Sequence, residues 1–181
     1  MFADIVLFTK NREVEDLEKQ LGFTTVLFRE DLKPFNISEG GDYDKNRKIL
    51  ENKRTDILLN PESLKNSSDI NHILCKLAHD NNIIIAFSLA KLKNENIFNK
   101  IISDIKLFRK YKVKCAIASF AREKYDLRNS SDIISLGKVM GMTPKEAKDS
   151  LIHIYNLYKE KSDKTRISKG IRLIKPALTL K

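Results

Sequence analysis

Two apolar runs separated by a helical pattern constrain the fold of this sequence most strongly. Ile83–Ser88 and Cys115–Ser119 are apolar up to a closing serine, as expected of strands that are buried on both faces of a parallel sheet. Between them, apolar side chains recur at helical spacing from Ile97 to Phe108. A strand, a helix and a second strand in this order predict two parallel strands joined by a right-handed crossover.

The same alternation extends along the rest of the chain. Apolar spacing indicates further helices near Val14–Leu21, Ile70–Ala78 and Ala147–Tyr158. Shorter strands are predicted at Phe2–Phe8, Thr24–Phe28, Phe35–Ile37, Asp56–Leu59 and Ile171–Ile174. The stretch from Arg29 to Phe35 is too short to hold a full helix between two of these strands.

The alternation places the chain in the α/β class. It predicts an abbreviated, irregular (β/α) TIM-like barrel, because roughly seven strands would close within fewer residues than the roughly 250 of an ordinary barrel. An open, doubly wound sheet is the alternative. The chain has 181 residues without a repeat or a linker. Residues 1–181 are therefore expected to form a single barrel-like domain with a basic C-terminal tail.

Capping residues mark several helix starts. Thr143-Pro144-Lys145-Glu146 combines a capping box with a proline in the first helical turn. Asp42 follows a pair of glycines and is expected to cap the next helix, although backbone amides at such a turn can also bind an anion. Ser67 or Ser68 is expected to cap the helix that contains Ile70–Ala78.

The charge balance is the strongest compositional signal. The net charge is +10 and the isoelectric point is near 9.5. An excess of cations favours a polyanionic partner, because it raises the local concentration of that partner and releases counterions on contact. A purely solubilising role is the alternative, so charge alone favours nucleic acid without establishing it.

The cysteines and the lengths of the apolar runs indicate the cellular compartment in which the protein works. Cys75 and Cys115 each lie within an apolar run, which predicts buried free thiols and suits a reducing cytoplasm. No apolar run reaches the length that spans a membrane. Residues 1–8 lack the charged start and the cleavage site of a signal peptide. We therefore expect a cytoplasmic protein that has no membrane segment.

Residue patterns that carry catalysis are missing from the sequence. The three histidines are His72, His79 and His153, and the first two are expected on a solvated helix face. The sequence has no HExxH or CxxC spacing for a metal, no Walker lysine–serine ending after its glycines and no G-x-S-x-G nucleophile turn. We therefore predict no catalytic residue, no metal ligand and no cofactor bound by this chain.

The positive signal for function is a set of basic clusters with one aromatic residue among them. Arg122, Lys124 and Arg128 follow the Cys115–Ser119 strand, and Arg109 and Lys110 end the preceding helix. Arg47 and Arg54 precede the short strand at Asp56–Leu59, and Arg172 lies in the tail. Arginine grips phosphate bidentately and tyrosine stacks on bases. The predicted RNA-binding residues are Arg47, Arg54, Arg109, Lys110, Arg122, Lys124, Tyr125, Arg128 and Arg172.

Several sequence pieces together resemble a known family. They are Asp126-Leu127-Arg128, Asp132-Ile133-Ile134-Ser135-Leu136-Gly137 with Gly141-Met142, the run from Asn71 to Ala78, and Gly170-Ile171-Arg172. In these pieces the sequence resembles archaeal ribonuclease P protein component 3, a relative of the eukaryotic thirty-kilodalton ribonuclease P subunit. The resemblance extends from about Asn46 to Lys175 and is weak over Gly22–Phe35.

The resemblance implies a function that the residue patterns alone do not. It implies a barrel related to metal-dependent phosphoesterases but lacking their ligands. It also implies an RNA-binding subunit of ribonuclease P, which braces the catalytic RNA while that RNA and its Mg²⁺ ions remove the tRNA 5′ leader. Implied partners are ribonuclease P RNA, ribonuclease P protein component 2, with which such subunits form a two-plus-two heterotetramer, and other ribonuclease P proteins.

Two other functions and one partner surface remain open from the sequence. A small metal-dependent phosphoesterase barrel and a general RNA-binding assembly factor are the alternative functions. For the contact with a partner protein, the expected elements are the helix Asp132–Val139 and the helix that begins at Pro144. Gly137 and Gly141 would permit close approach there, unless they only end helices.

Overall fold

Four parallel strands form the centre of the molecule. The computed structural model describes residues 1–10, 12–63, 69–163, 166–168 and 171–172. Within these residues, the strands are β3 (Ile37–Glu39), β4 (Ile57–Leu59), β5 (Ile84–Ser88) and β6 (Cys115–Ala118), and they pair in that order. The two continuous apolar runs thus form the neighbouring strands β5 and β6, as predicted.

A second parallel pair extends the sheet beyond β6. β1 (Ala3–Ile5) pairs with β2 (Thr25–Leu27). Val6, just after β1, forms a parallel bridge with Ala121, just after β6. The strands therefore follow one another in the order β2-β1-β6-β5-β4-β3, and the 3₁₀ turn η1 (Arg29–Leu32) begins the connection from β2 to β3. This arrangement is an abbreviated, irregular (β/α) barrel.

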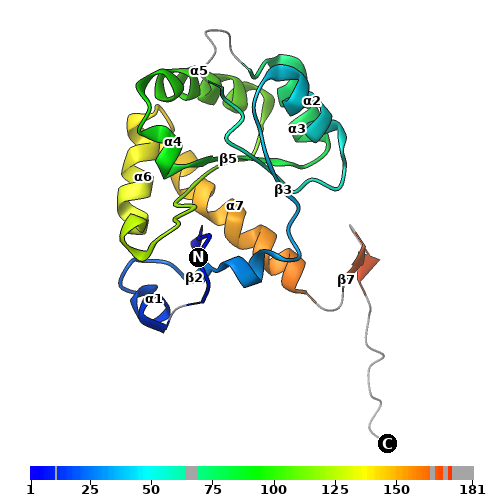
Figure 1. Cartoon of the computed structure of the whole chain (residues 1–181). Coiled ribbons are helices and arrows are strands. Elements are labelled where there is room, and N and C mark those ends of the chain that lie inside the picture. Colours follow the sequence, from blue (N-terminus) through cyan, green and yellow to red (C-terminus); the bar gives the residue numbers. More distant parts are fainter. Residues whose placement is uncertain (11, 64–68, 164–165, 169–170, 173–181) are drawn as a thin grey trace, which may run out of the picture.

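Helices cover the outer face of this sheet. α2 (Tyr43–Glu51), α3 (His72–Asp80) and α5 (Glu95–Tyr111) lie together on one side of the four-stranded sheet in Figure 1, and α6 (Ser130–Val139) flanks it. One buried apolar cluster fills this layer and includes Leu58, Ile85 and Ile117 from the strands. Alternate strand residues point to opposite faces, so their neighbours along each strand form a different layer.

The last long helix, α7 (Pro144–Ser162), closes the inner side. It crosses below the sheet in Figure 1. The second buried apolar cluster combines the fully buried side chain of Ile154 with inward-facing strand residues, among them Ile57, Ala86 and Ala116. Alanines on the inner face leave room for the helix, because a small barrel holds few large side chains. No described helix is long and apolar enough to cross a membrane.

The predicted caps are mostly confirmed. The Asp42 side chain accepts a hydrogen bond from the Lys45 amide at the start of α2, and Thr143 and Glu146 form the capping box of α7. The predicted cap of α3 was wrong, because that helix begins at His72 and is capped by Asn71. Ser67 and Ser68 lie outside the described residues.

Some elements differ from the prediction in length. The first helix, α1, is only Arg12–Leu17, and Leu17 is 42% exposed. Three short helical elements were not predicted: the 3₁₀ turn η1, α4 (Leu89–Leu92) directly after β5, and the 3₁₀ turn η2 (Lys124–Asp126). The predicted last strand is described as β8 (Ile171–Arg172), and it pairs antiparallel with β7 (Arg166–Ser168) rather than with the barrel strands.

Gly137 explains how closely α6 and α7 pack. A Cβ atom at this position would lie 3.2 Å from the Cβ of Ala147 and 3.2 Å from the sulfur of Met142. The close approach that Gly137 permits is therefore made to α7 of the same chain. The expectation that this glycine admits a partner protein was wrong, because its open side is already filled. Gly141 has a positive φ of 91° and ends the α6 segment, as in the alternative interpretation.

Candidate nucleic-acid interface

The loop that follows β6 is fixed at its base by a buried carboxylate. Asp4 of β1 accepts hydrogen bonds from the backbone N–H of Ser119 at 2.7 Å and from the Ser119 hydroxyl at 2.5 Å. The backbone N–H of Leu7 then donates to the carbonyl of Ala121 at 2.7 Å. Three hydrogen bonds between the two chain segments thus hold the first residues of the loop on the barrel.

Asp4 is fully buried, and its ionisation is shifted accordingly. Burial raises the pKa of Asp4 from 3.8 to about 6, although the hydrogen bonds from Ser119 lower that pKa in part. At neutral pH the carboxylate is ionised and accepts both hydrogen bonds, as a buried charge requires. Asp4 therefore serves as an anchor for the loop.

The cationic side chains of this loop differ in the contacts that they make within the chain. Lys124 forms an ion pair with Glu13 of α1 at 2.7 Å, and its Nζ lies 5.2 Å from the ring centroid of Tyr125. Tyr125 itself is 78% exposed. An exposed aromatic ring beside a cation can stack on an unpaired base. The loop therefore presents Tyr125 to solvent on a supported backbone.

Arg128 is oriented by the loop itself. Its Nη1 donates to the carbonyl oxygen of Tyr125 at 3.0 Å and to that of Leu127 at 2.7 Å. A guanidinium has five N–H donors, so Nη2 and Nε remain for another acceptor. Arg122, which is also exposed, makes no side-chain hydrogen bond or ion pair with any residue that the structure describes. Arg122 and Arg128 line the same hollow.

Arg109 and Lys110 lie at the other end of the barrel. Arg109 ends α5 and lines a hollow together with Lys114 and Cys115 at the start of β6, whereas Arg122 follows the end of that strand. The prediction that these two clusters occupy opposite rims is confirmed. The two clusters therefore face different surroundings.

Arg109 is engaged within the chain. Its Nε and Nη2 each donate to the carboxylate of Glu146 at 2.7 Å, and Nη2 also donates to the carbonyl of Gly141 at 2.8 Å. This bidentate contact lowers the pKa of Glu146 from 4.5 to about 2. Lys110 lies with its Nζ 5.5 Å from the ring centroid of Tyr111. Arg109 thus joins α5 to the capping box of α7.

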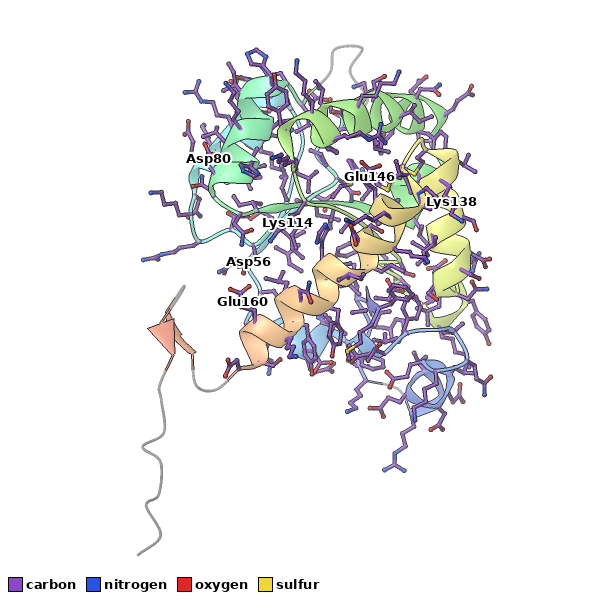
Figure 2. All side chains as sticks on the ribbon, turned by 180° about the vertical axis from the view of Figure 1, so that it is seen from behind. Asp56, Asp80, Lys114, Lys138, Glu146 and Glu160 are labelled. Carbon is purple, nitrogen blue, oxygen red and sulfur yellow. The ribbon has the colours of Figure 1, made fainter. Side chains whose placement is uncertain are left out.

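The surface where α7 crosses the sheet carries charges of both signs. Figure 2 shows Lys114, Asp56 and Glu160 along this side of the molecule. Asp56 forms an ion pair with Lys161 of α7, with 2.7 Å between Oδ2 and Nζ. Because these charges neutralise one another locally, this edge attracts a polyanion less than an edge of one sign does.

The remaining predicted RNA-binding residues lie apart from the loop. Arg47 of α2 pairs with Glu51 one turn later, at 2.8 Å. Arg54 is exposed in the turn before β4, and its carbonyl accepts from the Asn36 side chain. The backbone of Arg172 is in β8, but its side chain lies outside the described residues. The structure brings together Arg122, Lys124, Tyr125 and Arg128, but not the others.

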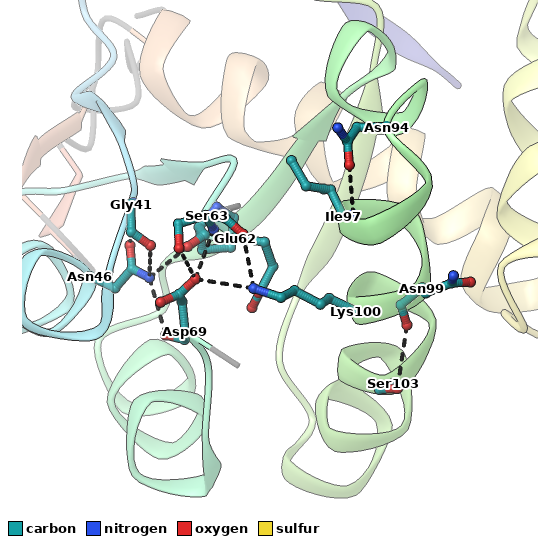
Figure 3. Close-up of polar contacts among 11 residues, drawn as sticks. Gly41, Asn46, Glu62, Ser63, Asp69, Asn94, Ile97, Asn99, Lys100 and Ser103 are labelled. Carbon is teal, nitrogen blue, oxygen red and sulfur yellow. Dashed lines mark hydrogen bonds and ion pairs between the residues drawn. The ribbon is translucent and has the colours of Figure 1, made fainter. Parts of the chain in front are cut away.

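A buried polar network follows β4, and sequence reasoning did not find it (Figure 3). Asn46 of α2 is fully buried; its side chain accepts from the Gly41 amide at 2.9 Å and donates to the carbonyls of Pro61 and Asp69. Lys100 of α5 lies 3.3 Å from Glu62 and 3.5 Å from Asp69. The network joins α2 and α5 to the residues that follow β4 and to Asp69, which precedes α3, so it has a structural role.

Asp104 of α5 extends this network into the core. It is 2% exposed, and burial together with the nearby Glu62 carboxylate raises its pKa far above the ordinary value. Burial thus favours the protonated, neutral form of the Asp104 carboxyl. The described residues contain no group of three or more histidines, cysteines and carboxylates placed to hold a metal ion. His72 and His79 are exposed on α3, as predicted, and both cysteines are free thiols.

Comparison with known proteins places the chain in a family. A sequence model described as RNase P subunit p30 matches residues 37–164. The chain belongs to the RNase P subunit p30 family. The sequence resemblance to archaeal component 3 is thereby confirmed.

Individual relatives agree with this assignment. Ribonuclease P protein component 3 of Methanococcoides burtonii is 32% identical over 146 residues, which are 76% of this chain and 60% of the relative. The protein of the same name from Methanosarcina mazei is 36% identical over 121 residues, 64% of this chain and 50% of the relative. The chain thus spans only about 50–60% of the length of these relatives.

A solved structure supports the fold. A chain in a structure described as archaeal ribonuclease P with mature tRNA superposes with a TM-score of 0.72 at 20% sequence identity. The match covers 98% of this chain and 90% of the other. Similarity at this level of identity establishes the shared barrel architecture.

Proposed function

We propose that this p30-family chain is an RNA-binding protein subunit of ribonuclease P, which supports endonucleolytic removal of the tRNA 5′ leader by the catalytic RNA. Membership of the family over residues 37–164 is the observation that carries this proposal. The net charge of +10 agrees with it, because a subunit of a ribonucleoprotein must offset phosphate repulsion.

The loop of residues 119–128 is the surface that we assign to RNA. It leaves the carboxyl end of β6, where barrels carry their functional loops. Its base is anchored by Asp4, Arg128 is oriented by its own backbone, and Tyr125 is exposed. Arg122 and Arg128 would bind phosphate and Tyr125 would stack on a base. Arg47, Arg54, Lys110 and Arg172 are secondary candidates at other positions.

In this proposal the chain itself does no chemistry. The RNA binds the Mg²⁺ ions that activate water, and the protein neutralises and braces the RNA. Ribonuclease P protein component 2 is the proposed direct partner, in a two-plus-two heterotetramer that joins the RNA and the other ribonuclease P proteins. We place the assembly in the cytoplasm, where the free thiols of Cys75 and Cys115 stay reduced.

Identification of the RNA that the chain binds in cells tests this proposal. A tagged chain is purified under mild salt, and the RNA that copurifies is sequenced. Ribonuclease P RNA, recovered in excess over its cellular share, is the expected result. Recovery of ribosomal precursor RNA instead would favour the general assembly factor and contradict the proposal.

A further inference from the structure

We propose that Lys93 forms, with Arg122 and Arg128, a seat for one phosphate of a single-stranded RNA segment, and that an adjoining apolar groove holds the neighbouring base. This inference rests on the proposed function as an RNA-binding subunit and specifies which nucleic-acid feature the loop binds. Lys93 belongs to none of the sequence-predicted clusters.

The seat is a small hollow between two parts of the chain that are distant in sequence. Its lining includes Leu89 and Lys93 on one side and Ser119, Arg122 and Arg128 on the other. Its volume is about 120 Å³, well below the roughly 300–1,000 Å³ of pockets for larger organic ligands. A hollow of this size suits a compact anionic group.

The side chains that line the seat carry a net positive charge. Three cations line it against one carboxylate, that of Asp126. Within the described part of the chain, Lys93 and Arg122 have no side-chain hydrogen bond or ion pair. Arg128 uses only Nη1 internally. What sets this hollow apart from a single exposed lysine is that three cations from two parts of the chain line one small cavity.

The groove beside the seat is mainly apolar. It has a volume of about 430 Å³, and its apolar lining is Leu89 and Leu92 of α4 with Ile133 and Leu136 of α6, while Asp132 contributes one carboxylate. Lys93 and Arg128 line both the groove and the seat, so the two hollows share a rim. An apolar surface continuous with a phosphate seat matches a nucleotide, whose base is flat and apolar on its faces.

Single-stranded RNA fits this combination better than a duplex does. A duplex keeps its bases stacked inside, whereas loops and bulges expose bases that proteins hold on apolar and aromatic surfaces. Tyr125, 78% exposed in the same loop, offers a further stacking surface for the next base. The occupant that the geometry favours is therefore an unpaired nucleotide with its phosphate.

The test is a double-mutant cycle on RNA affinity measured as a function of salt. The full chain, with its partner proteins, is titrated with ribonuclease P RNA and separately with a single-stranded oligouridylate. The variants are Lys93→Ala, Arg122→Ala and both together. The matched control is Lys76→Ala with Lys106→Ala, two exposed lysines on α3 and α5, which changes the net charge by the same amount.

One shared phosphate predicts a specific pattern. Either single variant should make the slope of log affinity against log salt shallower by about 0.7, the value for one phosphate on a single strand. The double variant should add little to this change, because both side chains serve one phosphate. The control pair should leave the slope unchanged. Crosslinking by ultraviolet light should join uridine to the segments 89–93 or 125–136.

Other patterns would overturn the inference. Additive changes near 1.4 in the double variant would mean two separate phosphate contacts. Equal effects from the control pair would mean a long-range charge effect, and loss of protein partner binding with RNA affinity intact would mean a protein ligand. If wild-type assemblies fail to bind ribonuclease P RNA above the oligouridylate, the proposed function fails, whereas an unaffected Lys93→Ala variant in a working assembly removes only the seat.

Discussion

Asp4 and Ser119 join the first strand of the barrel to the end of the last, across 115 positions of sequence. Both donors of Ser119, its amide and its hydroxyl, are satisfied by one buried carboxylate. This contact closes β1 onto β6 and fixes the start of the loop that we assign to RNA.

Replacing Asp4 by Ala should destabilise the fold, because it leaves the Ser119 amide and hydroxyl buried without an acceptor. The expected loss in the free energy of unfolding is about 1–3 kcal/mol for such unsatisfied groups. Urea denaturation followed by circular dichroism measures it. Ser119→Ala, which removes only the hydroxyl, is the milder companion variant, and equal stability of Asp4→Ala and wild type would refute the anchoring role.

The pH dependence of stability should carry the signature of Asp4. Its folded pKa, about 6, lies above the value of 3.8 for an unburied aspartate. The folded state therefore holds the proton more tightly, so the stability it contributes below pH 3.8 is lost as pH rises towards 6. Asp4→Asn should flatten the fall of stability across this window. An unaltered pH profile in that variant would contradict the assigned pKa shift.

Arg109→Ala should act first on the fold. Loss of the bidentate contact with Glu146 loosens the contact between α5 and α7, so the variant should melt at a lower temperature than wild type, by a modest amount because the pair is partly exposed. Because Arg109 lowers the pKa of Glu146 from 4.5 to about 2, the stability from this pair is fully present above pH 4.5 and is lost as pH falls towards 2, so the difference in melting temperature between wild type and variant should be smaller at pH 3 than at pH 7. Thermal melting at pH 7 and pH 3 measures both effects. Lys110→Ala is the control. Equal melting temperatures of the two variants would refute the role of Arg109 in connecting α5 to α7.

Arg122→Ala combined with Arg128→Ala should weaken RNA support without affecting the fold. The reconstituted enzyme should cleave precursor tRNA more slowly at low Mg²⁺, and its RNA affinity should fall less steeply with salt than that of wild type, because fewer phosphate contacts release counterions. The melting temperature should stay near that of wild type, because exposed charges contribute little stability. If the variant cleaved at the wild-type rate at every salt concentration, the RNA-binding surface would have to lie outside this loop.

Assembly with ribonuclease P protein component 2 should be detectable by light scattering at micromolar concentration. Val139 of α6 is 70% exposed and Ile73 of α3 is 46% exposed, so apolar surface remains for a partner on either helix. Val139→Asp should weaken the complex if α6 faces component 2, and Ile73→Asp serves as the comparison. Separate monomers of the wild-type proteins at that concentration would contradict the proposed heterotetramer.

Local signals made much of the fold predictable from the sequence. The length of the apolar run Ile83–Ser88 favoured a buried strand, and the capping box from Thr143 to Glu146 indicated a helix start. Both signals involve neighbours in sequence, which composition and spacing reveal directly. The strands themselves are shorter than predicted, because a strand ends where its pairing partner ends rather than where its apolar run does.

The contacts that build the site could not be predicted from the sequence, because they join residues that are distant along the chain. Asp4 stands alone in an apolar strand, and nothing near it indicates Ser119 as its partner. Arg109 resembles any other cation at a helix end, but its partner Glu146 is 37 residues away. Lys93 follows a short helix that was not predicted, and only the packing of α4 against the loop after β6 brings it near Arg122.

Cleavage of precursor tRNA with and without this chain tests the central claim most directly. The isolated chain, incubated with precursor tRNA, Mg²⁺ and Mn²⁺, should leave the substrate intact. Added to ribonuclease P RNA with its partner proteins at low Mg²⁺, it should increase the rate of 5′ leader removal. Cleavage by the isolated chain that a point substitution in it abolishes, or a rate that is unaffected by omitting the chain, would contradict its role as a non-catalytic, RNA-bracing subunit.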